Sequence, residues 1–239
     1  MTRRQILARF AAAAPAAFLP TMARAEGGTP SAEEILGAVL QSMQRYSLTG
    51  SLRTRYKSRR VNVPFSLALA PGSIQFQFAE PAQSILINLA HDGYSLREGA
   101  PGAEKPVKAD RMKEFIRNTD VRFEDIAFRF LYWKNPVLLG EGERIKLQET
   151  WKLRLTNPDE IGPYGVVLLW VDQNSGAMLK LEGYDRKGRL TKKYEVSKVQ
   201  KSSQNEWMLE EMKVETIDPN TGDTVGSPTY MEVEEAKRK

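Results

Sequence analysis

The stretch of sequence that decides the fold is YGVVLLWVDQNSGAMLKLEGYDRKGRLTKKYEV, residues 164–196. Residues 166–171 form an apolar run without alternation, which is typical of a strand covered on both faces. Residues 172–176 are turn formers that end in Gly176, where a positive φ costs little. Alternating apolar and charged residues predict a strand over 179–182, and a turn at 185–188 leads to another over 190–196. The stretch therefore predicts a three-stranded antiparallel meander that must bury one face.

The length and composition limit the architecture. The chain has 239 residues, of which 41% are hydrophobic, enough for one domain with a sizeable core. No apolar segment has the length of a spanning helix. The chain has no cysteine, which excludes disulfides, thiolate metal sites and a lipid anchor on an N-terminal cysteine.

The first 25 residues have the pattern of an export signal rather than of a folded segment. A charged start is followed by a short Ala-rich apolar run and by a small-x-small cleavage sequence that ends at Ala25. Arg3-Arg4 followed by Ile6-Leu7 resembles a twin-arginine signal, and an ordinary Sec signal is the alternative. We therefore expect cleavage near Ala25, a single domain over residues 26–239, and a periplasmic location.

The charge of the mature chain argues against nucleic acid as a partner. Residues 1–25 contain four arginines and no acid, so the net charge falls from +5 to +1 without them. The densest basic stretch is RTRYKSRR, residues 53–60. We interpret it as the solvated face of an alternating strand, and the alternative is a patch for anionic lipid headgroups or an acidic partner.

The rest of the chain reads as strands with two helical segments. A capping box over Ser31 and Glu34 predicts a helix that runs to about Tyr46. A second amphipathic helix is expected within residues 110–133. Residues 99–109 are a loop by composition, and residues 234–239 are expected to fray. Further strands are predicted near residues 52–56, 61–69, 74–78, 85–89, 94–96, 138–147, 151–155, 207–214 and 230–233. Pro64 indicates an edge or a bulge.

This count predicts a mainly β (α+β) fold of about eleven strands, mostly antiparallel, with few helices. A large curved sheet with so little cover either closes on itself or leaves a lined cavity. The apolar strand residues that are candidates for such a lining are Phe65, Leu67, Leu69, Ile74, Phe76, Phe78, Ile85, Ile87, Leu168 and Trp170. The helical residues that are candidates for a lid over it are Leu36, Val39, Leu40, Met43, Phe123, Ile126 and Phe130. For any single one of them, plain core beneath a helix is the alternative.

The search for catalytic chemistry is mostly negative. The single histidine, His91, lies in an expected turn without a nucleophile to serve. No phosphate-binding loop and no cluster with metal-ligand spacing occurs. Glu124 and Asp125 begin an expected helix, where a cap or dipole partner is the favoured interpretation. We therefore predict no catalytic, cofactor or metal site.

Two segments resemble a known family. The first segment is similar to the outer-membrane lipoprotein-sorting (LolA-like) proteins. It consists of Leu169-Trp170-Val171-Asp172, Leu179-Lys180, Tyr184-Asp185, Gly188 and Lys193-Tyr194-Glu195-Val196. Residues 119–126, TDVRFEDI, resemble that family's motif before its middle helix. The signal, the first helix and the strand order agree as well, so the resemblance covers nearly all of the mature chain.

The resemblance implies an incomplete antiparallel β-barrel with a helical lid over its concave side. It also implies a periplasmic carrier that takes acyl chains from an inner-membrane transporter complex and delivers them to an outer-membrane acceptor. It implies no cofactor.

One feature of LolA proper is missing. An Arg-Pro pair in an early strand supplies an arginine that latches the lid, whereas residues 72–81 contain no arginine. That residue is not carried over, and a phospholipid or sterol-like molecule is an alternative cargo. The chief rival function is a periplasmic interaction or structural protein whose barrel is solidly packed and carries nothing.

Overall fold

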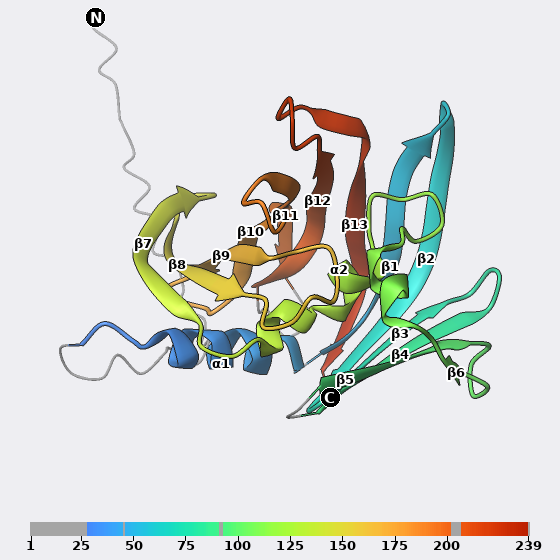
Figure 1. Cartoon of the computed structure of the whole chain (residues 1–239), viewed down its shortest axis with the longest axis horizontal. Coiled ribbons are helices and arrows are strands. Elements are labelled where there is room, and N and C mark those ends of the chain that lie inside the picture. Colours follow the sequence, from blue (N-terminus) through green and yellow to red (C-terminus); the bar gives the residue numbers. More distant parts are fainter. Residues whose placement is uncertain (1–27, 45, 91–92, 202–206, 239) are drawn as a thin grey trace, which may run out of the picture.

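The structure, a computed structural model, describes residues 28–44, 46–90, 93–201 and 207–238. The expected export signal and His91 lie outside these ranges. Thirteen strands form one antiparallel sheet in the order β6-β5-β4-β3-β2-β1-β13-β12-β11-β10-β9-β8-β7. The sheet curves around its helices and ends in two edges, β6 and β7, so it is an incomplete barrel with a small helical cover (Figure 1). The predicted fold class is confirmed.

The strands have the following bounds: β1 Tyr46–Tyr56, β2 Arg59–Ala70, β3 Ser73–Phe78, β4 Gln83–Ala90, β5 Gly93–Gly99, β6 Lys105–Pro106, β7 Val137–Ile145, β8 Gln148–Thr156, β9 Val166–Asp172, β10 Met178–Tyr184, β11 Leu190–Lys201, β12 Trp207–Ile217 and β13 Thr224–Arg238. The α-helices are α1 Ala32–Gln44 and α2 Phe123–Ala127, and the 3₁₀ helices are η1 Ala109–Lys113 and η2 Arg129–Tyr132.

The central meander forms as the sequence predicts. Strands β9, β10 and β11 pair in antiparallel order, and their turns place Gly176 and Gly188 at φ of 68° and 74°. Leu181 of β10 pairs with Leu169 of β9 and with Tyr194 of β11, and all three side chains are buried. The meander therefore contributes one continuous apolar face to the core.

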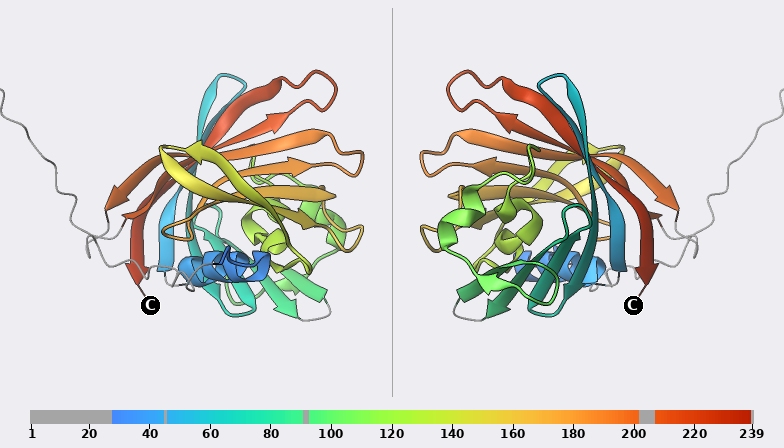
Figure 2. Two further views of the ribbon diagram at one scale, coloured as in Figure 1. Left: turned by 90° about the vertical axis from the view of Figure 1, so that its left-hand side faces the viewer. Right: turned by 90° about the vertical axis from the view of Figure 1, so that its right-hand side faces the viewer.

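Helix α1 begins at the predicted capping box. The Ser31 backbone N–H donates to Glu34 Oε2 over 2.7 Å, and the Glu34 N–H donates to Ser31 Oγ over 3.2 Å. The helix ends at Gln44, so its expected extension to Tyr46 is wrong, because Tyr46 already begins β1. Helix α1 contacts β1 and β2 and lies across the concave side of the sheet (Figure 2).

The second expected helix is divided into two short ones. Phe128 lies between α2 and η2 in a left-handed conformation, with φ 46° and ψ 28°. This conformation costs a non-glycine residue about 1–2 kcal/mol and cannot continue a helix. Its ring is buried, so apolar packing holds the backbone in the conformation that helical periodicity alone would not predict.

Two strand details differ from expectation, and a third agrees with it. Strand β6 lies inside the expected loop 99–109, where it pairs with β5. Strand β13 continues to Arg238 instead of fraying, because β1 pairs with it from Tyr46 onward. Pro64 lies in β2 just before that strand gains β3 as its second neighbour at Phe65, in agreement with the predicted edge position.

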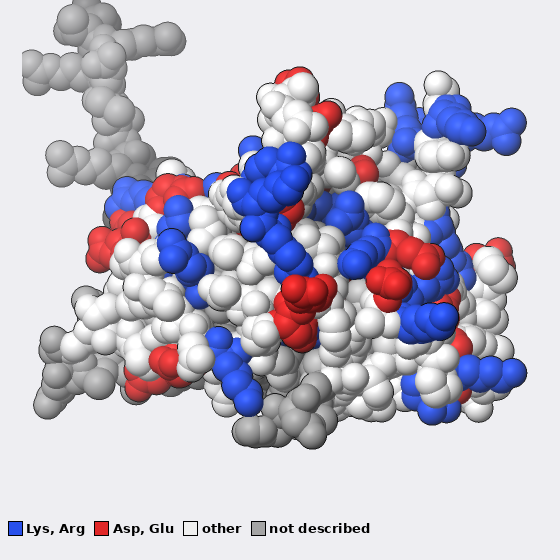
Figure 3. Space-filling model, viewed as in Figure 1, with Lys and Arg blue, Asp and Glu red and all other residues white. Residues whose placement is uncertain are grey.

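The molecular surface carries interspersed acidic and basic side chains. In the face drawn in Figure 3, the tip of the β1–β2 hairpin at the upper right carries basic side chains without acidic ones beside them. Among the described residues, no helix has the length and apolar character that a membrane crossing requires.

Candidate functional site

The concave face of strands β2, β3 and β4 is a continuous apolar surface. The antiparallel register places Phe65 opposite Phe78, and it places Phe76 between Leu67 and Ile85. Leu69, Ile74 and Ile87 continue the same row. The ring centroid of Phe76 lies 4.8 Å from that of Phe65 and 5.1 Å from that of Phe78. The register thus brings eight of the ten candidate lining residues together on one face.

The other two candidates lie on the opposite face of the sheet. On β9, Leu168 pairs with Arg154 and Trp170 pairs with Lys152, both outward-facing residues of β8. The Trp170 ring lies between the ammonium groups of Lys152 and Lys180, at 4.4 Å and 4.2 Å. Its Nε1–H donates to Glu143 over 2.6 Å. We therefore take only the eight residues of β2, β3 and β4 forward as the candidate apolar lining.

The helices cover this lining. The candidate lid residues and the lining belong to one apolar cluster in the interior. Val39 and Ile126 are fully buried, whereas Leu40 and Met43 are half-buried at the cluster's margin. The concave face is therefore closed by helical side chains in this conformation.

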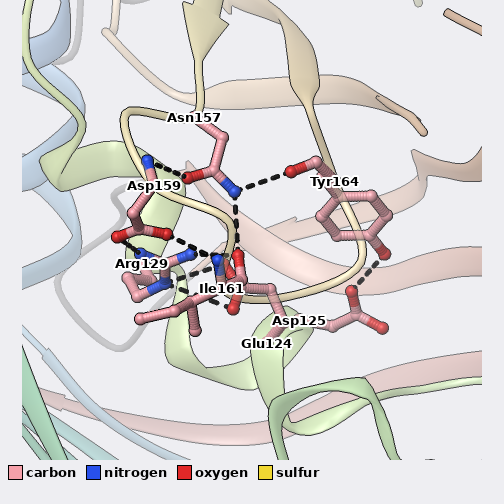
Figure 4. Close-up of polar contacts among 7 residues, drawn as sticks. All are labelled: Glu124, Asp125, Arg129, Asn157, Asp159, Ile161 and Tyr164. Atoms are coloured by element: carbon pink, nitrogen blue, oxygen red, sulfur yellow. Dashed lines mark hydrogen bonds and ion pairs between the residues drawn. The ribbon is translucent and has the colours of Figure 1, made fainter. Parts of the chain in front are cut away.

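A buried ion-pair network holds the α2–η2 segment in place (Figure 4). Arg129 donates from Nε to Glu124 Oε1 over 3.1 Å, from Nη1 to Asp159 over 3.0 Å and from Nη2 to the Ile161 carbonyl over 2.8 Å. Asn157 organises the β8–β9 loop that receives this arginine, since its side-chain amide donates to the Ile161 carbonyl over 2.8 Å. The segment is thereby tied to the loop before the central meander.

The two carboxylates of α2 have different roles. Asp125 accepts the Arg122 backbone N–H over 2.6 Å, which is the cap that the sequence favours. Its other oxygen accepts the Tyr164 hydroxyl over 2.5 Å. Glu124 is fully buried, and this burial raises its pKa to about 7 although Arg129 opposes the shift.

Lys192 joins the same segment to strand β11. Its side chain, 1% exposed, donates to the Asp120 carbonyl and, over 3.0 Å, to Thr216 Oγ1. Its ammonium lies 3.9 Å from Asp125 Oδ2. Burial lowers the pKa of Lys192, and Asp125 opposes that change. Two interior cations, Arg129 and Lys192, therefore bind the segment that covers the apolar face.

The sequence contains a signal that Lys192 is buried. Its expected face in residues 190–196 is otherwise occupied by Leu190, Tyr194 and Val196, so a lysine there must be buried with a partner. Arg129, between Phe128 and Phe130, is a similar signal. The partners Asp159 and Tyr164 lie on another loop, and no local pattern identifies them.

The network fastens the α2–η2 segment through buried contacts. Its donors and acceptors bind one another, and breaking a buried pair by removing one partner typically costs about 3–5 kcal/mol. Among the residues that the structure describes, no group of three His, Asp or Glu side chains is placed to hold a metal ion.

The fold is shared with solved structures of low sequence identity. A domain named for outer-membrane lipoprotein sorting, from Vibrio parahaemolyticus, superposes with a TM-score of 0.70 at 15% identity, covering 87% of this chain and 92% of that one. A LolA superfamily protein from Nitrosomonas europaea gives 0.67 at 21% identity, covering 88% and 94%. A DUF1329 family protein from Desulfovibrio piger gives 0.66 at 17% identity, with the same coverage.

Sequence comparison supplies the family. No curated protein matches the sequence. A family model described only as that of an uncharacterized protein matches residues 101–238, more than half of the chain. The chain therefore belongs to the family that this model describes, and its fold is that of the LolA-like proteins.

Proposed function

We propose that the protein is a periplasmic carrier that binds the acyl chains of a lipoprotein or lipid against its concave apolar face and shuttles them toward the outer membrane. The observation that carries this proposal is the row of eight apolar side chains on β2, β3 and β4 beneath a cover of short helices. The proposal includes export through residues 1–25, a single mature domain over 26–239, and no catalytic step.

The energetics of acyl chains favour such a design. Each methylene removed from water contributes roughly 0.8 kcal/mol, so a long chain needs on the order of 12 kcal/mol of compensation to stay in a soluble complex. An aromatic and aliphatic surface supplies this without fixing the identity of the cargo. By resemblance, an inner-membrane complex would load the carrier and an outer-membrane acceptor would unload it.

The present conformation requires the cover to move before cargo binds. The eight lining residues are at most 5% exposed, and helical side chains of the same cluster cover them. An acyl chain therefore takes the place of those helical side chains. The helix α1 is the part of the cover that we expect to swing away, since it is a continuous helix of 13 residues held through one apolar stripe.

The same burial favours a second candidate function. A barrel filled by its own side chains would suit a periplasmic interaction or structural protein without cargo. The two functions differ in whether the interior accepts a hydrocarbon chain at all.

A crosslink between α1 and the sheet tests the proposal. A Cβ added at Gly176, in the β9–β10 turn, lies 3.3 Å from the Ala38 Cβ on α1, close to the Cβ separation of about 3.8 Å in disulfides. The natural chain has no cysteine, so Ala38→Cys with Gly176→Cys yields a single disulfide. Uptake of a fluorescent fatty acid is then measured in the oxidised and the reduced protein.

We expect the reduced double variant to take up the fatty acid and the oxidised one to lose at least about tenfold in affinity. Each single-cysteine variant, which cannot form the bond, is the matched control and should not respond to oxidant. Absence of uptake by the unmodified protein, together with absence of lipid in its organic extract by mass spectrometry, would favour the packed barrel. Equal uptake by the oxidised variant would show that α1 is not the moving part.

A further inference from the structure

The tip of the β1–β2 hairpin separates from the neighbouring strands of the sheet. Strand β1 pairs with β13 only as far as Arg53, and β2 pairs with β3 only from Phe65 onward. The residues between them have only each other as strand partners. At about 3.3 Å per residue, the ribbon continues roughly 10 Å beyond its last pair with β13 and roughly 20 Å beyond its last pair with β3. Figures 1 and 2 show its tip apart from the tip of the β12–β13 hairpin, which rises to a similar height.

The projecting part is basic on both of its faces. Arg55, Lys57, Arg59 and Arg60 are exposed, and Tyr56 between them is 44% exposed. Arg55 pairs across the strands with Arg60, which puts two like charges side by side at a cost to the hairpin. The solvated face of a strand, the interpretation favoured from the sequence, would place the charges on one side only. Only a partner that places negative charge on both faces of the tip can therefore neutralise all of these cations.

The charges of the tip have no acid to pair with. Among the described residues, these four cations form no ion pair, whereas Arg53, at the point where the hairpin leaves the sheet, pairs with Glu211 over 3.6 Å and with Glu232. The turn itself keeps Lys57 and Ser58 at φ of 46° and 66°, where glycine or asparagine is usual. The apex of the turn thus carries a cation in a backbone conformation that is energetically unfavourable for lysine.

We propose that the hairpin tip docks the protein onto an anionic phospholipid surface. The four guanidinium and ammonium groups lie on both faces of the ribbon. A tip that enters a layer of phosphate headgroups is surrounded by phosphates, so each of these cations can contact one. Tyr56 places an amphipathic ring at the depth of the headgroups. A compact acidic protein would meet only one face of the ribbon and leave the other uncompensated. The proposal is independent of whether the interior carries an acyl chain.

Flotation with lipid vesicles tests the docking. The purified protein is mixed with vesicles of equal parts phosphatidylglycerol and phosphatidylcholine, or of phosphatidylcholine alone. The test variant carries Arg55→Gln, Lys57→Gln, Arg59→Gln and Arg60→Gln. The control variant loses the same charge at four other exposed sites without ion pairs, namely Lys105→Gln, Lys108→Gln, Lys134→Gln and Lys187→Gln. Circular dichroism establishes that both variants fold.

The unmodified protein and the control variant are expected to float with the anionic vesicles and not with the neutral ones. The hairpin variant should bind at least about tenfold more weakly, since each cation near an anionic surface contributes measurably. Binding should vanish near 1 M salt, where the Debye length is about 3 Å. Tyr56→Ser should weaken binding less than the loss of the four charges.

Three results would overturn the proposal. These are no binding of the unmodified protein to anionic vesicles, equal loss in the hairpin and control variants, and equal binding to neutral vesicles. If the hairpin variant aggregates and the unmodified protein does not bind vesicles, the charges serve instead to prevent association through the exposed strand edges.

Discussion

Glu124 is a side chain through which we expect the stability of the helical cover to depend on pH. It is fully buried against Arg129, and burial raises its pKa from an ordinary value of 4.5 to about 7. Between these values the folded protein holds a proton at Glu124 that the unfolded chain has released. Because the folded state binds more protons there, the contribution of Glu124 to stability decreases as the pH rises through this window.

The substitution Glu124→Gln is expected to remove this pH dependence. The difference in unfolding free energy between the unmodified protein and the variant should fall by on the order of 2–3 kcal/mol from pH 4.5 to pH 8, measured by urea denaturation. The control is Glu149→Gln. That carboxyl is exposed, and its hydrogen bond from Arg144 lowers its pKa, so any change should be small and of opposite sign. A difference that stays constant with pH would contradict the assignment to Glu124.

At the level of residues, the sequence identifies apolar character better than the direction in which a side chain points. The candidate lining on β2 and β3 alternates with polar residues or alanine, and such alternation assigns each side chain to a face. On β4, Leu86 separates Ile85 from Ile87, so the pairing with β3 assigns the faces there. Residues 166–171 do not alternate, so both faces of β9 look equally apolar. The assignment of Leu168 and Trp170 needs the register with β8, where Lys152 and Arg154 mark the outer face.

At the level of elements, strand β1 is held closely against β13 at one glycine. The register of the two strands shifts at Gly50, and a Cβ at that position would overlap the carbonyl oxygen of Glu232. This backbone approach joins the β1–β6 part of the sheet to the β13–β7 part. Gly37 offers a contrast, because it is exposed within α1 and a Cβ there would contact nothing within 4 Å.

The same substitution is therefore expected to have opposite effects at these two glycines. Gly50→Ala should destabilise the protein by at least about 2 kcal/mol, since backbone atoms must shift to admit the methyl group. Gly37→Ala should stabilise it by about 0.5–1 kcal/mol, because alanine loses less conformational entropy in a helix. Urea denaturation of both variants measures this, and a Gly50→Ala protein as stable as the unmodified one would mean that the strands are free to separate there.

Elements are predictable from the sequence where their cause is local. The capping box places the start of α1 correctly, and the turn residues place the end of β9, both ends of β10 and the start of β11. The division at Phe128 and the extension of β13 to Arg238 have causes distant in sequence. The first depends on packing in the interior, and the second depends on pairing with β1, almost the length of the chain away.

At the level of the whole molecule, the order of strands determines what the helices cover. Because β1 lies beside β13, the first six strands and the last seven form one curved surface rather than two sheets. Helix α1 reaches from β2 to the β9–β10 turn, so it spans the space between the two parts. A curved sheet held by backbone hydrogen bonds is the rigid part of such a molecule, and a cover held through side chains is the part that we expect to open.

Hydrogen exchange measured with and without a saturating fatty acid, such as oleate, tests this division of the molecule. If the carrier proposal holds, the amides of α1 should exchange faster in the complex, because the acyl chain takes the place of its apolar side chains on the sheet. The amides of β9, β10 and β11 should keep their protection, since their bonds lie within the sheet. The oxidised Ala38→Cys, Gly176→Cys protein is the control and should show no change in α1. Unchanged or slower exchange of the cover at saturating oleate would place the fatty acid outside the concave face, and the carrier proposal would fail.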